Sequence, residues 1–170
     1  VMRNKKTGET ILNQDVSVVK NVEKNIISIP LKPNQVQLWS EFNPQLYSIE
    51  LRDSNYLLLE KTIGFRSFKR EGNQMFVNGE PLFLRGNLDN CHFPLTGYPS
   101  MKKEDWLKIF SIQKEYGCNN IRFHSYCPPE AAFEAADELG IYLAPEVGVW
   151  IDGWMPGQIT PLGMNNYSLN

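Results

Sequence analysis

The first 68 residues show the period-two alternation of hydrophobic and polar positions that is typical of β-strands. The alternation is clear over residues 15–20 and 46–51, and residues 27–29 add a shorter stretch. Turn-forming residues separate these segments at positions 6–8, 32–34 and 53–55. Such short strands are typical of an immunoglobulin-like β-sandwich, which needs about seven strands, whereas roughly four or five fit here. We therefore expect a partial sandwich over residues 1–68, with a small complete β module as the alternative.

A β-hairpin is predicted directly after this region. The apolar segments 75–77 and 82–84 flank Asn78-Gly79, the most favourable two-residue hairpin turn. Pro81 lacks a backbone N–H and therefore indicates that this side of the hairpin is a sheet edge.

From residue 82 onward, strand-like and helix-like segments alternate. We expect strands at 82–85, 120–123 and 141–144. One helix should begin at Ser100 as N-cap and end at Gly117, and a second should run from 128–130 to Leu139 and end at Gly140. This βαβαβ order predicts a parallel sheet, in either a doubly wound fold or a barrel. The first strand lacks a following glycine-rich phosphate loop, which disfavours a nucleotide-binding fold.

Composition narrows the class of protein further. The 170 residues are 42% hydrophobic and 21% charged with a net charge of -2, which is typical of a globular chain. The sequence contains no basic stripe that would indicate nucleic-acid binding. No apolar run approaches the ~20 residues of a membrane span. The three cysteines match no zinc spacing, which leaves three free thiols or a Cys91–Cys127 pair as alternatives.

The first residues, VMRNKKTGET, contain neither an initiator methionine nor a signal-peptide core. We expect the chain to start inside a larger protein. The sequence leaves the compartment open, with a periplasmic or secreted bacterial location as one option.

Polar side chains gather where the expected parallel strands end, which is where α/β folds bind ligands. Aromatic residues accompany them, and this combination suits a sugar, whose hydroxyls need hydrogen bonds and whose C–H faces stack on rings. The alternative to ligand binding is a structural role for each of these side chains: a structural ion pair, a half-buried histidine, a strand cap, solvated loop residues, or packing against another part of the protein. The candidate residues are Asn87, Asp89, Asn90, His92, Arg122, His124, Ser125, Tyr126, Glu146, Trp150, Asp152 and Trp154.

Five segments, in order, resemble motifs of glycoside hydrolase family 2. They are LWSEFNPQLY (38–47), IGFR (63–66), FVNGEPLFLRG (76–86), NNIR (119–122) and ADELGIY (136–142). The resemblance covers about residues 38–146. It implies an immunoglobulin-like sandwich over residues 1–68 that leads into a TIM barrel, of which residues 69–170 hold the first three strands.

The resemblance also implies a retaining glycosidase that cleaves a β-linked sugar with two glutamates. In this family the glutamates follow the fourth and seventh barrel strands, so we expect no catalytic acid or nucleophile in this chain and no activity of the chain alone. Arg122 matches the arginine that holds the nucleophilic carboxylate. Substrate-binding roles are expected for Asn87, Asp89, His92, His124, Glu146 and Trp150.

The chain departs from the family pattern at several positions. The segment after Arg122 reads FHSYCP, so that His124 is displaced by one position, and the loop 87–97 also differs. Gly148 stands where the β-galactosidase branch has a histidine that helps to shape a magnesium site. We therefore expect no metal and no cofactor, and another substrate than that of β-galactosidase.

Three hypotheses follow. The chain is part of a retaining glycosidase with a carbohydrate substrate, or a non-catalytic carbohydrate-binding or scaffold module, or a nucleotide-binding protein, which the missing glycine loop disfavours. An isolated three-stranded parallel sheet would leave an open edge, so we also expect self-association of the chain.

Overall fold

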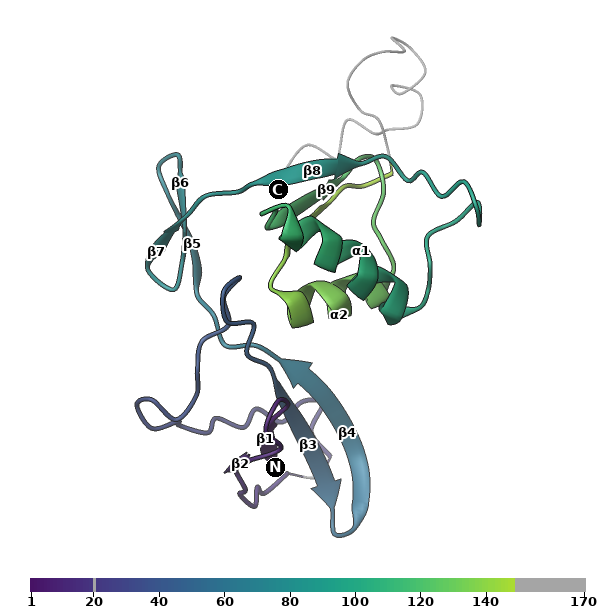
Figure 1. Cartoon of the computed structure of the whole chain (residues 1–170). Coiled ribbons are helices and arrows are strands. Elements are labelled where there is room, and N and C mark those ends of the chain that lie inside the picture. The colour runs from purple at the N-terminus through teal and green to yellow at the C-terminus, as the bar shows by residue number, and fades with distance from the viewer. Residues whose placement is uncertain (20, 149–170) are drawn as a thin grey trace, which may run out of the picture.

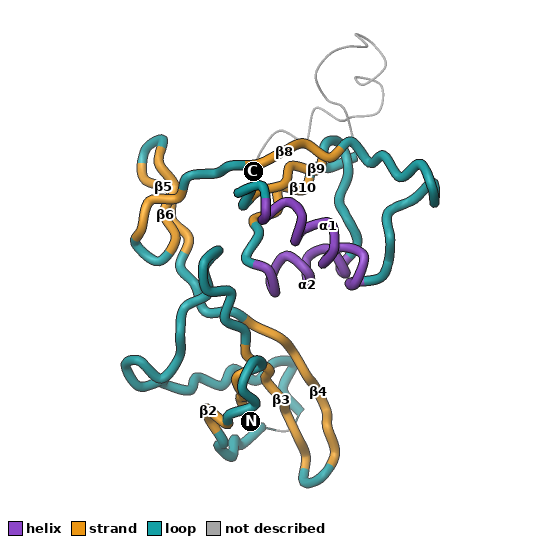
Figure 2. Tube along the Cα trace, viewed as in Figure 1, coloured by secondary structure: helices purple, strands orange, loops and turns teal. Residues whose placement is uncertain are grey.

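The structure, a computed structural model, describes residues 1–19 and 21–148, so that Trp150, Asp152 and Trp154 lie outside the described residues. This part contains three sheets and two helices (Figures 1 and 2). The strands are β1 (Met2–Asn4), β2 (Thr10–Leu12), β3 (Tyr47–Asp53), β4 (Tyr56–Ile63), β5 (Phe68–Glu71), β6 (Gln74–Val77), β7 (Glu80–Leu82), β8 (Gly86–Asp89), β9 (Asn120–Phe123) and β10 (Tyr142–Pro145). The helices are α1 (Lys103–Glu115) and α2 (Glu130–Leu139). The fold is thus mixed, with antiparallel sheets before a parallel α/β unit.

The first sheet is antiparallel, with strand order β2-β1-β3-β4. The turn between β1 and β2 forms because the Asn4 side chain accepts hydrogen bonds from the backbone N–H groups of Lys6 and Thr7. The predicted strand over residues 46–51 is confirmed as β3, and it pairs with β4 across a turn in which Ser54 has a positive φ of 52°.

The strands predicted at 15–20 and 27–29 were wrong, because the described residues between β2 and β3 contain no strand (Figure 2). Their apolar side chains find no neighbouring strand to pack against, and Val19 and Ile27 are 64% and 44% exposed. The Asn25 side chain instead bonds to the backbone of Val19. Alternation alone does not make a strand without cross-strand partners.

The predicted hairpin is confirmed, as β6 and β7 flank Asn78-Gly79, and β5 completes a sheet of order β5-β6-β7. Both turn residues have positive φ, 55° and 88°, as the favoured hairpin turn requires. The prediction of a strand at 82–85 was wrong, because β8 starts only at Gly86. Residues 83–85 connect the two sheets, and the Asn119 side chain holds them by accepting from the Arg85 N–H at 2.7 Å and donating to the Phe83 carbonyl at 3.0 Å.

The third sheet is parallel with strand order β10-β9-β8, and it confirms the expected βαβαβ order. Both helices cover the same face of this sheet (Figure 1). The core lies between them and the sheet, around the buried residues Trp106, Phe110, Ile121, Phe123 and the alanines of α2. No described element covers the opposite face, where Leu88, Arg122 and Ala144 stand in register and are exposed.

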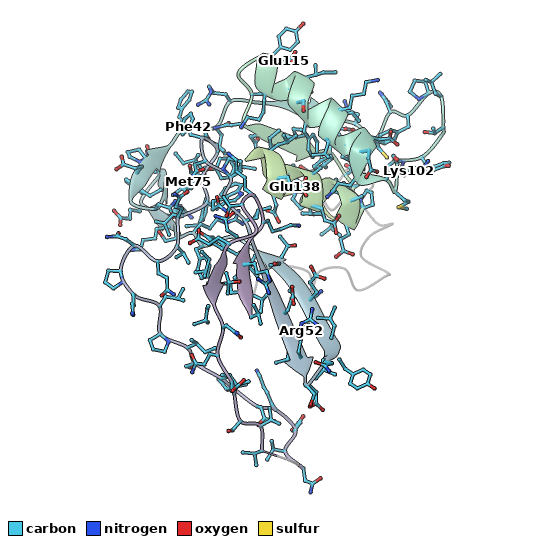
Figure 3. All side chains as sticks on the ribbon, turned by 60° about the horizontal axis from the view of Figure 1, so that its bottom comes forward. Phe42, Arg52, Met75, Lys102, Glu115 and Glu138 are labelled. Carbon is cyan, nitrogen blue, oxygen red and sulfur yellow. The ribbon has the colours of Figure 1, made fainter. Side chains whose placement is uncertain are left out.

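Both ends of α2 agree with the sequence, whereas the start of α1 differs. α2 ends at Gly140, which has a left-handed φ of 73°. α1 begins at Lys103 with Lys102 as N-cap, so the predicted Ser100 N-cap was wrong. The Ser100 hydroxyl instead accepts from the Lys102 N–H and bonds to Asp105. Figure 3 shows Lys102 and Glu115 at opposite ends of α1. Neither helix is long and apolar enough to cross a bilayer.

Residues 38–43 join the antiparallel region to the α/β unit. The Trp39 side chain is 1% exposed and its indole donates to the Asp137 carbonyl at 2.7 Å. The buried Glu41 carboxylate accepts from Arg85 at 2.8 Å and from Asn119 at 2.5 Å. These contacts lie at the amino ends of the parallel strands and leave the carboxyl ends for a site.

Candidate functional site

The candidate site begins with an ion pair at the carboxyl ends of β9 and β10. Arg122 lies on β9 and Glu146 follows β10 directly. The Nε and Nη2 atoms of Arg122 both lie 2.5 Å from Oε1 of Glu146. The side chains are 56% and 29% exposed, so the pair is open to solvent on the face of the sheet opposite to the helices.

The loop after β9 holds the second oxygen of Glu146. The backbone N–H of Ser125 donates to Oε2 at 2.7 Å, and His124 Nδ1 lies 3.2 Å from the same atom. The Ser125 hydroxyl lies 3.3 Å from His124 Nδ1. Glu146 is therefore the common acceptor of this cluster, and its two oxygens are held by different groups.

These contacts lower the pKa of the Glu146 carboxyl to about 2. The main cause is the hydrogen bond from the Ser125 N–H, followed by the hydrogen bond from Arg122, because both stabilise the ionised form. Glu146 is thus a carboxylate at neutral pH. It can accept hydrogen bonds, and it is unsuited to donate a proton there.

The structure divides the predicted site residues into two groups. Arg122, His124 and Glu146 come together. Asn87 and Asp89 stand in register with Ile121 and Phe123, whose side chains are buried against the helices. Strand geometry therefore points them away from the face of Arg122. With His92 they line a shallow cavity of about 230 Å³ between β8 and α1. Trp150 lies outside the described residues.

Two residues near the cluster were candidates from the sequence but received no predicted role. Ser125 and Tyr126 stood only among polar and aromatic residues after a strand, and no pattern distinguished them. The Tyr126 ring packs edge-on against Phe123, with the ring centroids 5.3 Å apart. Burial, and after it the Asp89 carboxylate, raises the pKa of the Tyr126 phenol, which stays protonated at neutral pH.

The cysteines and the absence of a metal cluster complete the description. Cys91, Cys118 and Cys127 are free thiols in the structure, the first of the two alternatives above. Within residues 1–19 and 21–148, no group of three or more histidine, cysteine or acidic side chains could hold a metal ion. The expectation of no metal and no cofactor stays a prediction for the whole protein.

Comparisons with known proteins identify the relatives of this chain. No family model matches it. A β-galactosidase of Photobacterium profundum is 27% identical over 137 residues, which cover 78% of this chain and 13% of the relative. A β-galactosidase of Vibrio vulnificus is 30% identical over 123 residues, which cover 69% and 12%.

Solved structures of glycosidases also match this chain. A β-glucuronidase from Ruminococcus gnavus matches with a TM-score of 0.58 and 27% identity, over 68% of this chain and 21% of that chain. The chain is thus similar to β-galactosidases and β-glucuronidases. A family 2 member from Bacteroides cellulosilyticus shares the fold with a TM-score of 0.67 at 24% identity, over 86% of this chain and 19% of that one.

These relatives are much longer than this chain, which spans about an eighth of the β-galactosidases, 13% and 12% of their length. β-Galactosidases and β-glucuronidases are O-glycosyl hydrolases, and they act on carbohydrates. The resemblance given by the five sequence segments is confirmed at this level.

Proposed function

We propose that this chain is part of a retaining β-glycosidase of family 2. In this proposal residues 1–68 belong to an immunoglobulin-like sandwich, and residues 69–170 supply the first three strands of a TIM barrel. The observation that carries the proposal is the cluster of Arg122, His124 and Glu146 at the carboxyl ends of parallel strands. This is the end at which α/β barrels build their active sites.

The open face of the parallel sheet fits the interior of a barrel. Two helices cover one face, as the outer layer of a barrel would, and Arg122 stands on the other. An exposed arginine on that face has a use in a barrel, because it can reach a carboxylate from a later strand. Arg122 also makes an ion pair with Glu146, and a purely structural role in that pair is the alternative function of this arginine.

We assign Arg122 the task of holding the nucleophilic carboxylate of the parent enzyme. A guanidinium donates two parallel hydrogen bonds and keeps a neighbouring carboxylate ionised. Glu146 and His124 would bind sugar hydroxyls, since an ionised carboxylate accepts hydrogen bonds at neutral pH. Asn87, Asp89 and His92 keep a proposed substrate role, at the cavity between β8 and α1 and not beside Arg122.

The chemistry itself would need two further glutamates. A retaining glycosidase places its nucleophile and acid/base about 5 Å apart, one to form the glycosyl-enzyme and one to protonate the leaving group. Glu146 accepts hydrogen bonds from Arg122 and Ser125 and is held ionised, so it does not suit the acid role, and one glutamate cannot fill both roles. We therefore propose that the 170-residue chain alone hydrolyses no glycoside.

The stereochemistry of the first product tests this proposal. The full-length protein is given a panel of aryl β-glycosides, and NMR follows the anomeric proton of the released sugar. We expect hydrolysis of at least one β-glycoside with the β-anomer formed first. A first product of α-configuration would contradict the retaining mechanism. Sugar binding without hydrolysis of any member would favour a non-catalytic carbohydrate-binding module.

A further inference from the structure

Ser125 has a backbone conformation that serine rarely adopts. Its φ is 60°, in the left-handed region that residues other than glycine rarely adopt. Such conformations persist where the surrounding structure imposes them, and they are frequent at functional sites.

The loop around Ser125 is fixed on both sides by the parallel sheet. The His124 N–H donates to the Asp89 carbonyl at 2.8 Å, which extends the pairing of β8 with β9 by one residue. The Glu146 N–H donates to the Tyr126 carbonyl at 3.1 Å on the other side. Ser125 lies between these two bonds, so its left-handed turn is what directs its own N–H to the Glu146 side chain.

The contacts form a chain from this backbone to the guanidinium. The Ser125 N–H donates to Oε2 of Glu146, and Oε1 of the same carboxylate accepts from both Nε and Nη2 of Arg122. A carboxylate fixed at one oxygen presents the other in one direction. The rotamer of an otherwise exposed arginine is thereby selected.

We propose that Ser125 is a positioning residue, whose left-handed backbone fixes Glu146 and, through Glu146, the direction of the Arg122 guanidinium. The inference rests on the proposed function, in which Arg122 faces the nucleophile of the parent enzyme. Ser125 acts through its backbone conformation, and its hydroxyl is not required for this task.

Titration of Glu146 tests the geometric part in the 170-residue chain. NMR of the side-chain carboxyl carbon should give a midpoint near the pKa of about 2 in the wild type. Ser125→Gly keeps the N–H and accepts a positive φ, so the midpoint should stay low. Ser125→Val disfavours a positive φ and should move the midpoint toward the ordinary value of 4.5. Among the described residues, Arg122 and His124 are the other charged or titratable groups that touch this carboxylate, and both remain in every variant.

Ser54→Val is the matched control. Ser54 also has a positive φ, 52°, but it lies in the turn between β3 and β4, far along the chain from Glu146. Its substitution should destabilise the chain and leave the Glu146 midpoint unchanged. A raised midpoint in Ser125→Gly would show that the Ser125 side chain anchors Glu146. An unchanged midpoint in folded Ser125→Val would show that the backbone conformation of residue 125 does not anchor Glu146. Either result overturns the proposal.

Catalysis in the full-length enzyme tests the functional part. Ser125→Val should lower kcat by up to about 100-fold, the scale of a misplacement of about 1 Å, with KM less affected, while Ser125→Gly should retain kcat. Full kcat in Ser125→Val overturns the role of Ser125 in positioning. A full-length wild type that cleaves no glycoside overturns the proposed function instead, and the titration then still decides whether Ser125 fixes Glu146.

Discussion

Glu146 links the local geometry to a measurable effect of pH. Its pKa is lowered to about 2, from an ordinary value of 4.5, by the Ser125 N–H and by Arg122. A carboxyl whose pKa is lower in the folded state stabilises that state fully above its unfolded pKa. This contribution is lost as the pH falls from 4.5 toward 2.

We therefore expect acid to destabilise the wild type more than Glu146→Gln. The free energy of unfolding, from urea denaturation between about pH 5 and about pH 2, should fall less steeply in the variant because it has no group to protonate at this position. The difference should be small, since solvent screens an open ion pair. Equal slopes in both proteins would mean that Glu146 makes no such contacts in solution.

At the scale of elements, the α/β part was predictable and the residues between β2 and β3 were not. β9, α2 and the Asn78-Gly79 hairpin follow from local signals: a buried apolar run, a Gly140 cap and a turn that needs positive φ. The strand expected at 15–20 had the same alternation as β3 but no partner strand in the described part of the chain. Pairing is decided by tertiary contacts, which alternation does not encode.

The candidate site shows the same limit. Arg122 and Glu146 could be found because they lie at the carboxyl ends of neighbouring parallel strands, and these ends meet at one edge of the sheet. Asn87 and Asp89 were placed with them because the first strand was expected to end at Arg85. With β8 at Gly86–Asp89 they lie within the strand, on the side of the helices. A shift of a few residues in one boundary thus moved two side chains to another face.

Gly140 carries a prediction for the end of α2. It has a φ of 73°, and a Cβ atom there would lie 2.8 Å from both Cα and the carbonyl oxygen of Glu41. Gly140→Ala should therefore lower the free energy of unfolding by about 2–4 kcal/mol, from left-handed strain together with overpacking. The measurement is urea denaturation followed by circular dichroism.

Gly117→Ala is the control, since Gly117 has a similar φ of 78° with nothing within 4 Å of the added Cβ. Strain alone should then cost about 1–2 kcal/mol. Equal losses in the two variants would exclude the close contact between Gly140 and Glu41.

At the scale of the whole molecule, Glu41 connects the antiparallel region to the α/β unit. Its carboxylate is buried and bonds to Arg85 and Asn119, and its carbonyl accepts from Lys114 Nζ at 2.7 Å. Glu41→Ala would leave Asn119 without this acceptor and should cost about 2 kcal/mol. Thermal unfolding followed by tryptophan fluorescence should show a lower melting temperature.

Glu50→Ala gives the comparison for this prediction. Glu50 also pairs with an arginine at 2.8 Å, Arg52, but in the exposed hairpin of β3 and β4, where Figure 3 shows Arg52 far from the helices. The Arg52 side chain is 44% and the Glu50 side chain 15% exposed, so solvent screens this pair and it should contribute about 1 kcal/mol or less. A Glu50→Ala loss as large as that of Glu41→Ala would contradict the role of the junction.

The face of the parallel sheet that no described element covers predicts self-association of the 170-residue chain. Leu88 on this face is 47% exposed, and Leu84, which precedes β8 in the chain, is 38% exposed. Apolar surface next to sheet edges favours contact between copies. Light scattering over a concentration series should show a rising mass, and Leu88→Glu should reduce it. A constant monomer mass at all concentrations would contradict the prediction.

The central claim is that Arg122 serves catalysis in the parent enzyme, and kcat together with the melting temperature of full-length Arg122→Ala tests it most directly. Losing a preorganised electrostatic group should cost about 2–4 kcal/mol of transition-state stabilisation. Arg122→Lys should also be impaired, because lysine keeps the charge but lacks the fork. We expect kcat to fall by these amounts while the melting temperature stays nearly unchanged. Full kcat in folded Arg122→Ala, or a loss of activity that follows only the loss of folded protein, would contradict the claim.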